Sequence, residues 1–80
     1  MTATVYTNRY AKFRKLLVNY RDKKGLTQKA FGEKIGMRQS EVSKYERGVR
    51  RLDIIELIDI AEALNIDPCD IITELKKIKK

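Results

Sequence analysis

The stretch RQSEVSKYERG, residues 38–48, is polar apart from Val42, Tyr45 and its final glycine. An α-helix turns by about 100° per residue, so these two apolar side chains lie on one face. The rest of the helix carries short polar or charged side chains, namely Gln39, Ser40, Glu41, Ser43 and Lys44. Such groups can hydrogen-bond to base edges: Gln pairs with adenine, Lys with guanine, Glu accepts from cytosine, and Ser serves either role. The alternative interpretation is a solvated helix face that contacts no ligand.

A rigid frame for this stretch is predicted by the residues that precede it. Thr27 is placed to cap a short helix that runs through Ile35, because its hydroxyl can accept from first-turn amides. The next helix is predicted over about residues 39–47. Only residues 36–38 separate the two helices, and so short a connection holds them at a steep angle, as in a helix-turn-helix.

The steric demands of this turn are visible in two glycines. Gly36 can adopt the left-handed backbone conformation that the turn needs. Gly32, four residues earlier, is small enough to let the following helix approach closely. Val42 and Tyr45 are then expected to face inward, with Met37 filling the turn.

Helical spacing of apolar residues continues on both sides of this unit. A first helix is predicted to end before Gly25, and its inner face is Tyr10, Phe13, Leu16, Leu17 and Tyr20. Asp53 and Glu56 have the spacing of a capping box and open a fourth helix. Its predicted inner stripe is Ile54, Leu57, Ile58, Ala61 and Leu64. A fifth helix opens at Asp67 and Pro68, with the stripe Ile71, Ile72, Leu75 and Ile78.

The predicted fold is therefore all-α, a compact bundle of five short helices. Eighty residues allow one domain. Residues 1–8 are expected to form a flexible N-terminal arm, residues 9–76 the folded domain, and residues 77–80 a basic C-terminal tail.

Composition excludes several classes of function. The chain has no His and one Cys, which leaves no Ser-His or Cys-His catalytic arrangement and no common zinc site. Its glycines are spaced as helix punctuation, and no phosphate-binding glycine loop is present. We therefore expect no enzymatic activity, no cofactor and no metal. No apolar run approaches the roughly 18 residues of a membrane span, so a cytoplasmic protein without membrane contact is expected.

Charge is distributed unevenly along the chain. Residues 1–52 contain fourteen Lys or Arg against four acidic residues, whereas residues 53–80 contain four Lys against seven. A basic first part with an acidic second part indicates a surface for a polyanion. Composition alone does not distinguish DNA from RNA or anionic lipid.

The segment RDKKGLTQKAFGEKIGMRQSEVSKYERGVRRLDIIELIDIAEALNI resembles the Xre family of phage repressor and Cro-like helix-turn-helix domains. The motifs GLTQ, KIGM, VSKYERG and IAEALNI fall in the order and spacing of that family, over roughly residues 10–72. The resemblance implies a bundle of the lambda-repressor-like type. It also implies that double-stranded DNA is the partner, bound by a dimer at a near-palindromic operator.

Individual roles follow from the resemblance. The residues that match the family's base readers are Gln39, Ser40 and Lys44, beside which the residue chemistry adds Glu41 and Ser43. The positions that match its phosphate contacts are Thr27, Gln28, Arg47, Arg50 and Arg51, with Gln28 also able to brace Gln39. Arg21 and Glu46 match a recurring ion pair between the first and third helices. Arg38 departs from the usual Ser or Thr cap, which costs about 1 kcal/mol and offers an added phosphate or base contact.

A homodimer interface is expected on the fourth and fifth helices. Ile55 and Ile60 lie off the predicted inner stripe of the fourth helix, and exposed apolar side chains favour a partner surface. The fifth helix contributes Ile72 and Leu75 to this expected interface.

The leading hypothesis is a sequence-specific DNA-binding transcriptional regulator. The alternative is an antitoxin-type interaction module that neutralises a toxin and binds DNA secondarily. A partner such as polymerase fits the first and a toxin fits the second. A neighbouring toxin gene would favour the second hypothesis, and an adjacent promoter with an inverted repeat would favour the first.

Overall fold

The computed structural model describes residues 8–78, and over that range the chain forms helices joined by turns, with no strand. The helices are α1 Asn8–Lys23, α2 Gln28–Ile35, α3 Gln39–Arg47, α4 Ile54–Leu64 and α5 Pro68–Lys76. The predicted all-α class and its five helices are confirmed within these residues. The expected arm at residues 1–8 lies outside the described residues except for Asn8, which begins α1, and the last two residues of the expected tail also lie outside them.

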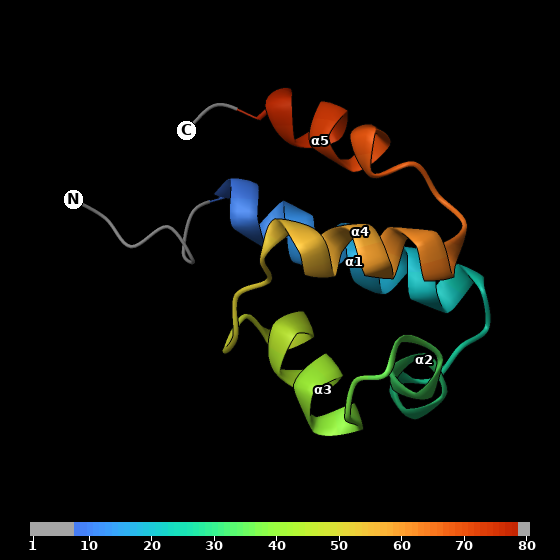
Figure 1. Cartoon of the computed structure of the whole chain (residues 1–80). Coiled ribbons are helices and arrows are strands. Elements are labelled where there is room, and N and C mark those ends of the chain that lie inside the picture. The colour runs from blue at the N-terminus through green and yellow to red at the C-terminus, as the bar shows by residue number, and fades with distance from the viewer. Residues whose placement is uncertain (1–7, 79–80) are drawn as a thin grey trace.

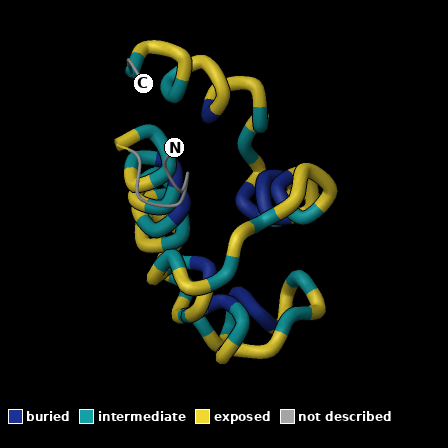
Figure 2. Tube along the Cα trace, turned by 90° about the vertical axis from the view of Figure 1, so that its left-hand side faces the viewer, coloured by how far each residue is buried: buried dark blue, intermediate teal, exposed yellow. Residues whose placement is uncertain are grey.

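The helices surround one small core. Figure 1 shows α5 on one side of α1 and α4, and the α2–α3 pair on the opposite side. The view turned by 90° in Figure 2 shows α1 and α4 as separate walls between those two layers, with their buried sides turned toward each other. The outer face of α3 therefore lies at the end of the molecule remote from α5.

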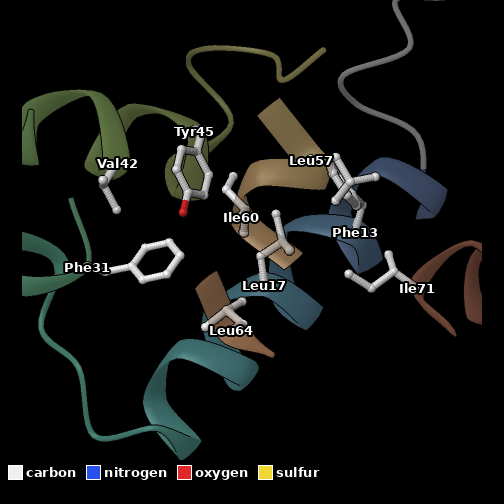
Figure 3. Packing of buried hydrophobic residues seen from close by; sticks show 9 residues of the cluster. All are labelled: Phe13, Leu17, Phe31, Val42, Tyr45, Leu57, Ile60, Leu64 and Ile71. Carbon is white, nitrogen blue, oxygen red and sulfur yellow. The ribbon is translucent and has the colours of Figure 1, made fainter. Parts of the chain in front are cut away.

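Every helix contributes at least one side chain to the core, which Figure 3 shows from close by. The core residues are Phe13, Leu17, Phe31, Val42, Tyr45, Leu57, Ile60, Leu64 and Ile71. Because the domain is small, each of these side chains is a large share of the apolar surface removed from water. The helix-turn-helix is thus packed on α1 and α4 and has no core of its own.

The inner face of α4 differs from the sequence expectation. Ile60 is 1% exposed and belongs to the core, whereas Ile54 and Ile58 are 58% and 37% exposed. The expectation that Ile60 is exposed for a dimer interface is therefore wrong. In the sequence IIELIDIAEAL two stripes fit helical spacing, and they share Leu57, Ala61 and Leu64. Packing against the other helices selects the stripe that contains Ile60.

The predicted caps are present. Thr27 Oγ1 accepts from the amide of Ala30 at 3.0 Å. Asp53 and Glu56 form a reciprocal capping box at the start of α4, in which each side chain accepts from the other residue's backbone amide. Asp67 caps α5, with Pro68 in its first turn. These local hydrogen bonds satisfy amides that a helix start leaves without an intrahelical partner.

Candidate nucleic-acid interface

The turn between α2 and α3 is closed by backbone geometry that requires glycine at two positions. Gly36 has φ +72°, in the left-handed region that side chains disfavour. The amide of Met37 donates to the carbonyl of Gly32 at 2.8 Å. A Cβ on Gly32 would lie 2.4 Å from the Met37 carbonyl oxygen, so the turn approaches α2 more closely than alanine permits. This contact fixes α3 relative to α2.

The inner face of α3 is held by apolar burial. Val42 is fully buried and Tyr45 is 1% exposed, as the spacing of residues 38–48 predicts. Burial raises the pKa of the Tyr45 phenol, and the nearby Glu46 carboxylate adds to this effect. Tyr45 therefore stays neutral in its apolar site over the physiological pH range. The polar side of α3 is left facing solvent.

The ion pair predicted between Arg21 and Glu46 is present and bidentate. Arg21 Nε lies 2.7 Å from Glu46 Oε2, and Arg21 Nη2 donates to Glu46 Oε1 at 3.0 Å. Only 12% and 6% of the two side chains are exposed. The hydrogen bond to Glu46 raises the pKa of Arg21. A paired fork of this kind fixes direction as well as distance, so α1 orients the C-terminal half of α3.

Two further side chains strengthen this anchor. Gln28 Nε2 donates to Glu46 Oε1 at 2.9 Å, so in the structure Gln28 braces Glu46, where the resemblance implied Gln39. The carboxylate is charged and therefore a stronger acceptor than an amide oxygen. Arg14, which sequence reasoning missed, donates from Nη1 to the carbonyl of Glu46 at 3.2 Å. A cation at this helix end is favoured by the partial negative charge of the terminal carbonyls.

The predicted base-reading residues lie on the solvent side of α3. Gln39, Ser40 and Lys44 are exposed, and Glu41 and Ser43 are half-buried. Arg38 occupies the cap position without a side-chain cap hydrogen bond, as expected from its departure from Ser or Thr. At the other end of α3, Arg47 Nε donates to Ser43 Oγ at 3.1 Å. The exposed side chains of α3 are thus Gln39, Ser40, Lys44 and Arg47, which are all polar.

Glu41 belongs to a group of charges that sequence reasoning did not bring together. Its carboxylate lies 3.3 Å from Lys44 Nζ and 3.0 Å from Arg50 Nε. Arg50 also pairs with Glu56 of α4 through both terminal nitrogens. The hydrogen bond with Glu56 raises the pKa of Arg50, and the same bond holds the pKa of Glu56 below its usual range. Only the i,i+3 spacing of Glu41 and Lys44 is a local signal for this group.

The remaining predicted phosphate contacts lie at the two ends of the helix-turn-helix. Thr27 is exposed at the start of α2. Arg51 is exposed in the turn after α3, with its guanidinium 4.7 Å from the ring centre of Tyr10. Together with Arg38 before α3 and Arg47 at its end, Arg51 places exposed cations at both ends of the helix.

The predicted dimer residues lie elsewhere. Ile55 on α4 is 62% exposed and Ile72 on α5 is 42% exposed, and Leu75 is half-buried. With Ile60 in the core, three of the four predicted residues have apolar surface that reaches solvent. The two most exposed of these three lie on different helices.

Neither a metal centre nor a membrane span is found in residues 8–78. No group of three His, Cys, Asp or Glu side chains there is arranged to hold a metal ion. None of the helices over the same residues has the length and apolar character to cross a bilayer.

Comparison with known proteins places this geometry in a family. A helix-turn-helix family model matches residues 17–71. A solved XRE-family-like protein from Pseudomonas syringae pv. tomato str. DC3000 is 35% identical, with 96% of this chain and 94% of that chain covered and a TM-score of 0.84.

A second solved structure, the clp gene regulator ClgR from C. glutamicum, shares the fold at 21% identity. Its TM-score is 0.77, with 89% of this chain and 92% of that chain covered. The comparison with curated proteins gave no match. The match of most of the chain to the family model, together with the 35% identity, shows that the chain belongs to the XRE-type helix-turn-helix family of DNA-binding transcription regulators.

Proposed function

We propose that the protein is a sequence-specific regulator that binds a near-palindromic operator as a homodimer, with α3 of each subunit in the major groove. The observation that carries this proposal is the division of α3 into two faces. Val42 and Tyr45 are buried, and Glu46 is fixed by Arg21, while Gln39, Ser40 and Lys44 are exposed. A helix that is rigidly anchored on one side and polar on the other can read base edges with a fixed register.

Phosphate contacts set that register. Thr27 and the first-turn amides of α2, beginning at Gln28, suit one phosphate, because a helix N-terminus favours an anion. Arg38, Arg47 and Arg51 suit phosphates on either side of the groove, since all three are exposed cations next to α3. Such contacts supply affinity without sequence information, and the base contacts of α3 supply preference.

A dimer would double the reading surface. The exposed apolar side chains of Ile55 and Ile72 offer a second copy of this chain a surface to cover, because burying them removes apolar surface from water. Two-fold symmetry would place the two copies of α3 about one turn of DNA apart, roughly 34 Å. Regulation would then follow from operator occupancy in the cytoplasm, by blocking or recruiting polymerase.

A second candidate is an antitoxin-type module that neutralises a toxin. The observation in its favour is the exposed apolar surface of α4, where Ile54, Ile55 and Ile58 all reach solvent. A toxin could cover this surface as well as a second copy could. Co-purification of a protein encoded beside this one, in a complex that masks Ile55, would favour this candidate.

Selection of bound duplexes from a random library, followed by sequencing, tests the main proposal. The expected result is an enriched inverted repeat whose half-site centres are about one helical turn apart. Binding that falls steeply with salt but enriches no sequence would contradict it, because phosphate contacts alone give that behaviour.

A further inference from the structure

A chain of four charged side chains links the DNA-facing side of α3 to the start of α4. We call it the Glu41 cluster, and its members are Lys44, Glu41, Arg50 and Glu56. It contains two cations and two carboxylates, so its formal charges cancel. Arg50 belongs to the turn of residues 48–53, which connects α3 to α4 (Figure 1).

All three guanidinium nitrogens of Arg50 have partners within the protein. Its Nε lies 3.0 Å from Glu41 Oε1, its Nη1 donates to Glu56 Oε1 at 3.2 Å, and its Nη2 pairs with Glu56 Oε2. Arg50 Nη1 also approaches the carbonyl of Arg51 at 3.4 Å. A phosphate that captured Arg50 would leave Glu56 without this cation and Glu41 with Lys44 alone, beside the charged backbone of the DNA. Arg50 is therefore poorly suited to be a phosphate ligand.

Glu41 is engaged on both carboxylate oxygens. One oxygen faces Arg50 and the other lies 3.3 Å from Lys44 Nζ. On α3, Glu41 is about 100° from the buried Val42, on a flank of the helix, whereas Ser40 and Lys44 lie closer to the middle of the polar face. The Glu41 side chain is 33% exposed and that of Lys44 is 46% exposed. Glu41 thus contacts the base-reading lysine and is turned away from the centre of the reading surface.

We propose that Glu41 and Arg50 are positioning residues that set the specificity of Lys44 and do not themselves bind DNA. Arg50 fixes Glu41 against α4, and Glu41 in turn orients the Lys44 ammonium and reduces its attraction to phosphate. A free lysine can reach many phosphates. A lysine held in one position is instead directed to a base acceptor at a single place in the groove. The inference rests on the proposed function and replaces the base-reading role predicted for Glu41 and the phosphate-binding role predicted for Arg50.

The test measures the salt dependence of binding to an enriched operator and to a random duplex for Glu41→Gln and Arg50→Gln. In Glu41→Gln the freed lysine should bind phosphate, so the random duplex should bind more tightly, with a salt slope steeper by about 0.9. Preference for the operator over the random duplex should fall by roughly tenfold. In Arg50→Gln the slope should stay unchanged on the random duplex while operator preference falls.

Three results would overturn the proposal. A slope that becomes shallower by about 0.9 in Arg50→Gln would show that Arg50 holds a phosphate. Loss of preference at a single base pair in Glu41→Gln, with an unchanged slope, would show that Glu41 reads that base itself. No change in either variant would also contradict the positioning role.

Controls separate these effects from misfolding and from failure of the proposed function. Arg51→Gln removes the same charge at the neighbouring position, where the slope should become shallower by about 0.9. Circular dichroism and urea unfolding establish that each variant is folded. The double variant Glu41→Gln with Arg50→Gln removes one charge of each sign, so it keeps the net charge and isolates the loss of positioning. A wild-type protein that binds duplexes without preference would refute the proposed function and leave no specificity to set, and the salt slopes would still decide whether Arg50 holds a phosphate and whether Glu41 keeps Lys44 from one.

Discussion

The Glu46 carboxylate, near the end of α3, accepts hydrogen bonds from side chains of the two preceding helices. Glu46 accepts from Arg21 of α1 and Gln28 of α2, and only 6% of its side chain is exposed. Removing one partner of such a pair would leave a largely buried charge without its counter-ion, which should lower the free energy of unfolding by about 3 kcal/mol or more. The orientation of α3, and with it that of the proposed base-reading residues, thus depends on side chains of α1 and α2.

Resemblance identified the Arg21–Glu46 pair from the sequence, but two other contacts were not predictable in this way. Gln28 was expected to brace Gln39, and its actual partner is Glu46. Arg50 pairs with residues nine positions before it and six after it. No helical or strand periodicity marks such spacings, because the turn after α3 sets them in three dimensions.

The base-reading role of α3 is tested by Gln39→Ala and Lys44→Ala. Each should weaken binding to the enriched operator by about 1–3 kcal/mol and relax preference at one position of each half-site. Competition between single-base variants of the operator measures both effects. Lys76→Ala on α5 removes a charge at the opposite side of the molecule from α3 (Figure 1) and should leave the preference intact. A loss for Lys44→Ala that is equal on all duplexes would identify a phosphate contact instead.

The ends of the helices are the best-predicted elements of this chain. Asp53, Glu56, Asp67 and Thr27 each act on amides within three residues, so their chemistry is visible in the sequence. The inner face of α4 was less predictable, because apolar residues occupy most of its positions. Ile60 was assigned outside and is buried, and Ile54 and Ile58 were assigned inside and are exposed. Tertiary packing, which spacing does not encode, decides between the two overlapping stripes.

Because α3 starts without a side-chain cap, a substitution at Arg38 should raise the stability of the fold while weakening its binding to DNA. Arg38→Ser should add a cap hydrogen bond and stabilise the fold by about 1 kcal/mol. The same change removes a cation proposed to hold phosphate, so the salt slope should become shallower by about 0.9. Urea unfolding and binding at several salt concentrations measure the two effects separately.

Arg38→Ala is the matched control, because it removes the charge without supplying a cap. Its salt slope should match that of Arg38→Ser, while its free energy of unfolding should not increase. A gain in stability of the same size in Arg38→Ala would mean that relief of charge repulsion, and not capping, stabilises α3.

The start of α4 should give the fold a specific sensitivity to acid. Arg50, through its hydrogen bond, keeps the pKa of Glu56 below its usual range, and the amide of Asp53 contributes in the same direction. The unfolded chain therefore binds the proton more tightly than the folded chain does. This stabilisation is present above the unfolded pKa of about 4.3 and is lost as pH falls through the lower folded value.

Glu56→Gln tests this pH dependence while keeping a side-chain oxygen for the capping box. The variant should be less stable than wild type at neutral pH, and the difference should shrink as pH falls below about 4. Urea unfolding between pH 3 and pH 7 gives the comparison, with those limits chosen to span the roughly 4.3 of an unfolded Glu. A difference that stays constant over this range would show that the charge of Glu56 does not contribute.

In the folded molecule, the charge asymmetry of the sequence falls on different helices. The cations of residues 8–52 lie on α1, α2 and α3 and in the turns beside them, whereas the acidic residues after position 52 lie mainly on α4 and α5. Figure 1 shows α3 and α5 at opposite sides of the molecule. A polyanion is therefore attracted to the α3 side and less so to the α5 side, which orients the protein before any base is contacted.

The proposed dimer depends on two exposed apolar side chains, one on α4 and one on α5. Ile55→Asp and Ile72→Asp should leave the folded monomer nearly as stable as wild type, because both side chains are well exposed, at 62% and 42%. Each should abolish the dimer by placing a charge in the apolar interface, where it would be desolvated without a partner. Sedimentation equilibrium with and without the operator measures the mass. Binding is also measured with duplexes that carry one or two half-sites. Because these variants should bind each half-site independently, their affinity per half-site should be almost the same on both duplexes.

Thr73→Asp is the matched control, since it adds the same charge on α5 one residue from Ile72 and about 100° around the helix. It should retain the wild-type mass and the cooperative affinity for two half-sites. A wild-type protein that stays monomeric at high concentration and on its operator would contradict the dimer proposal. In that case a single α3 would contact the DNA in each complex. The exposed isoleucines of α4 would then indicate a contact with a different protein.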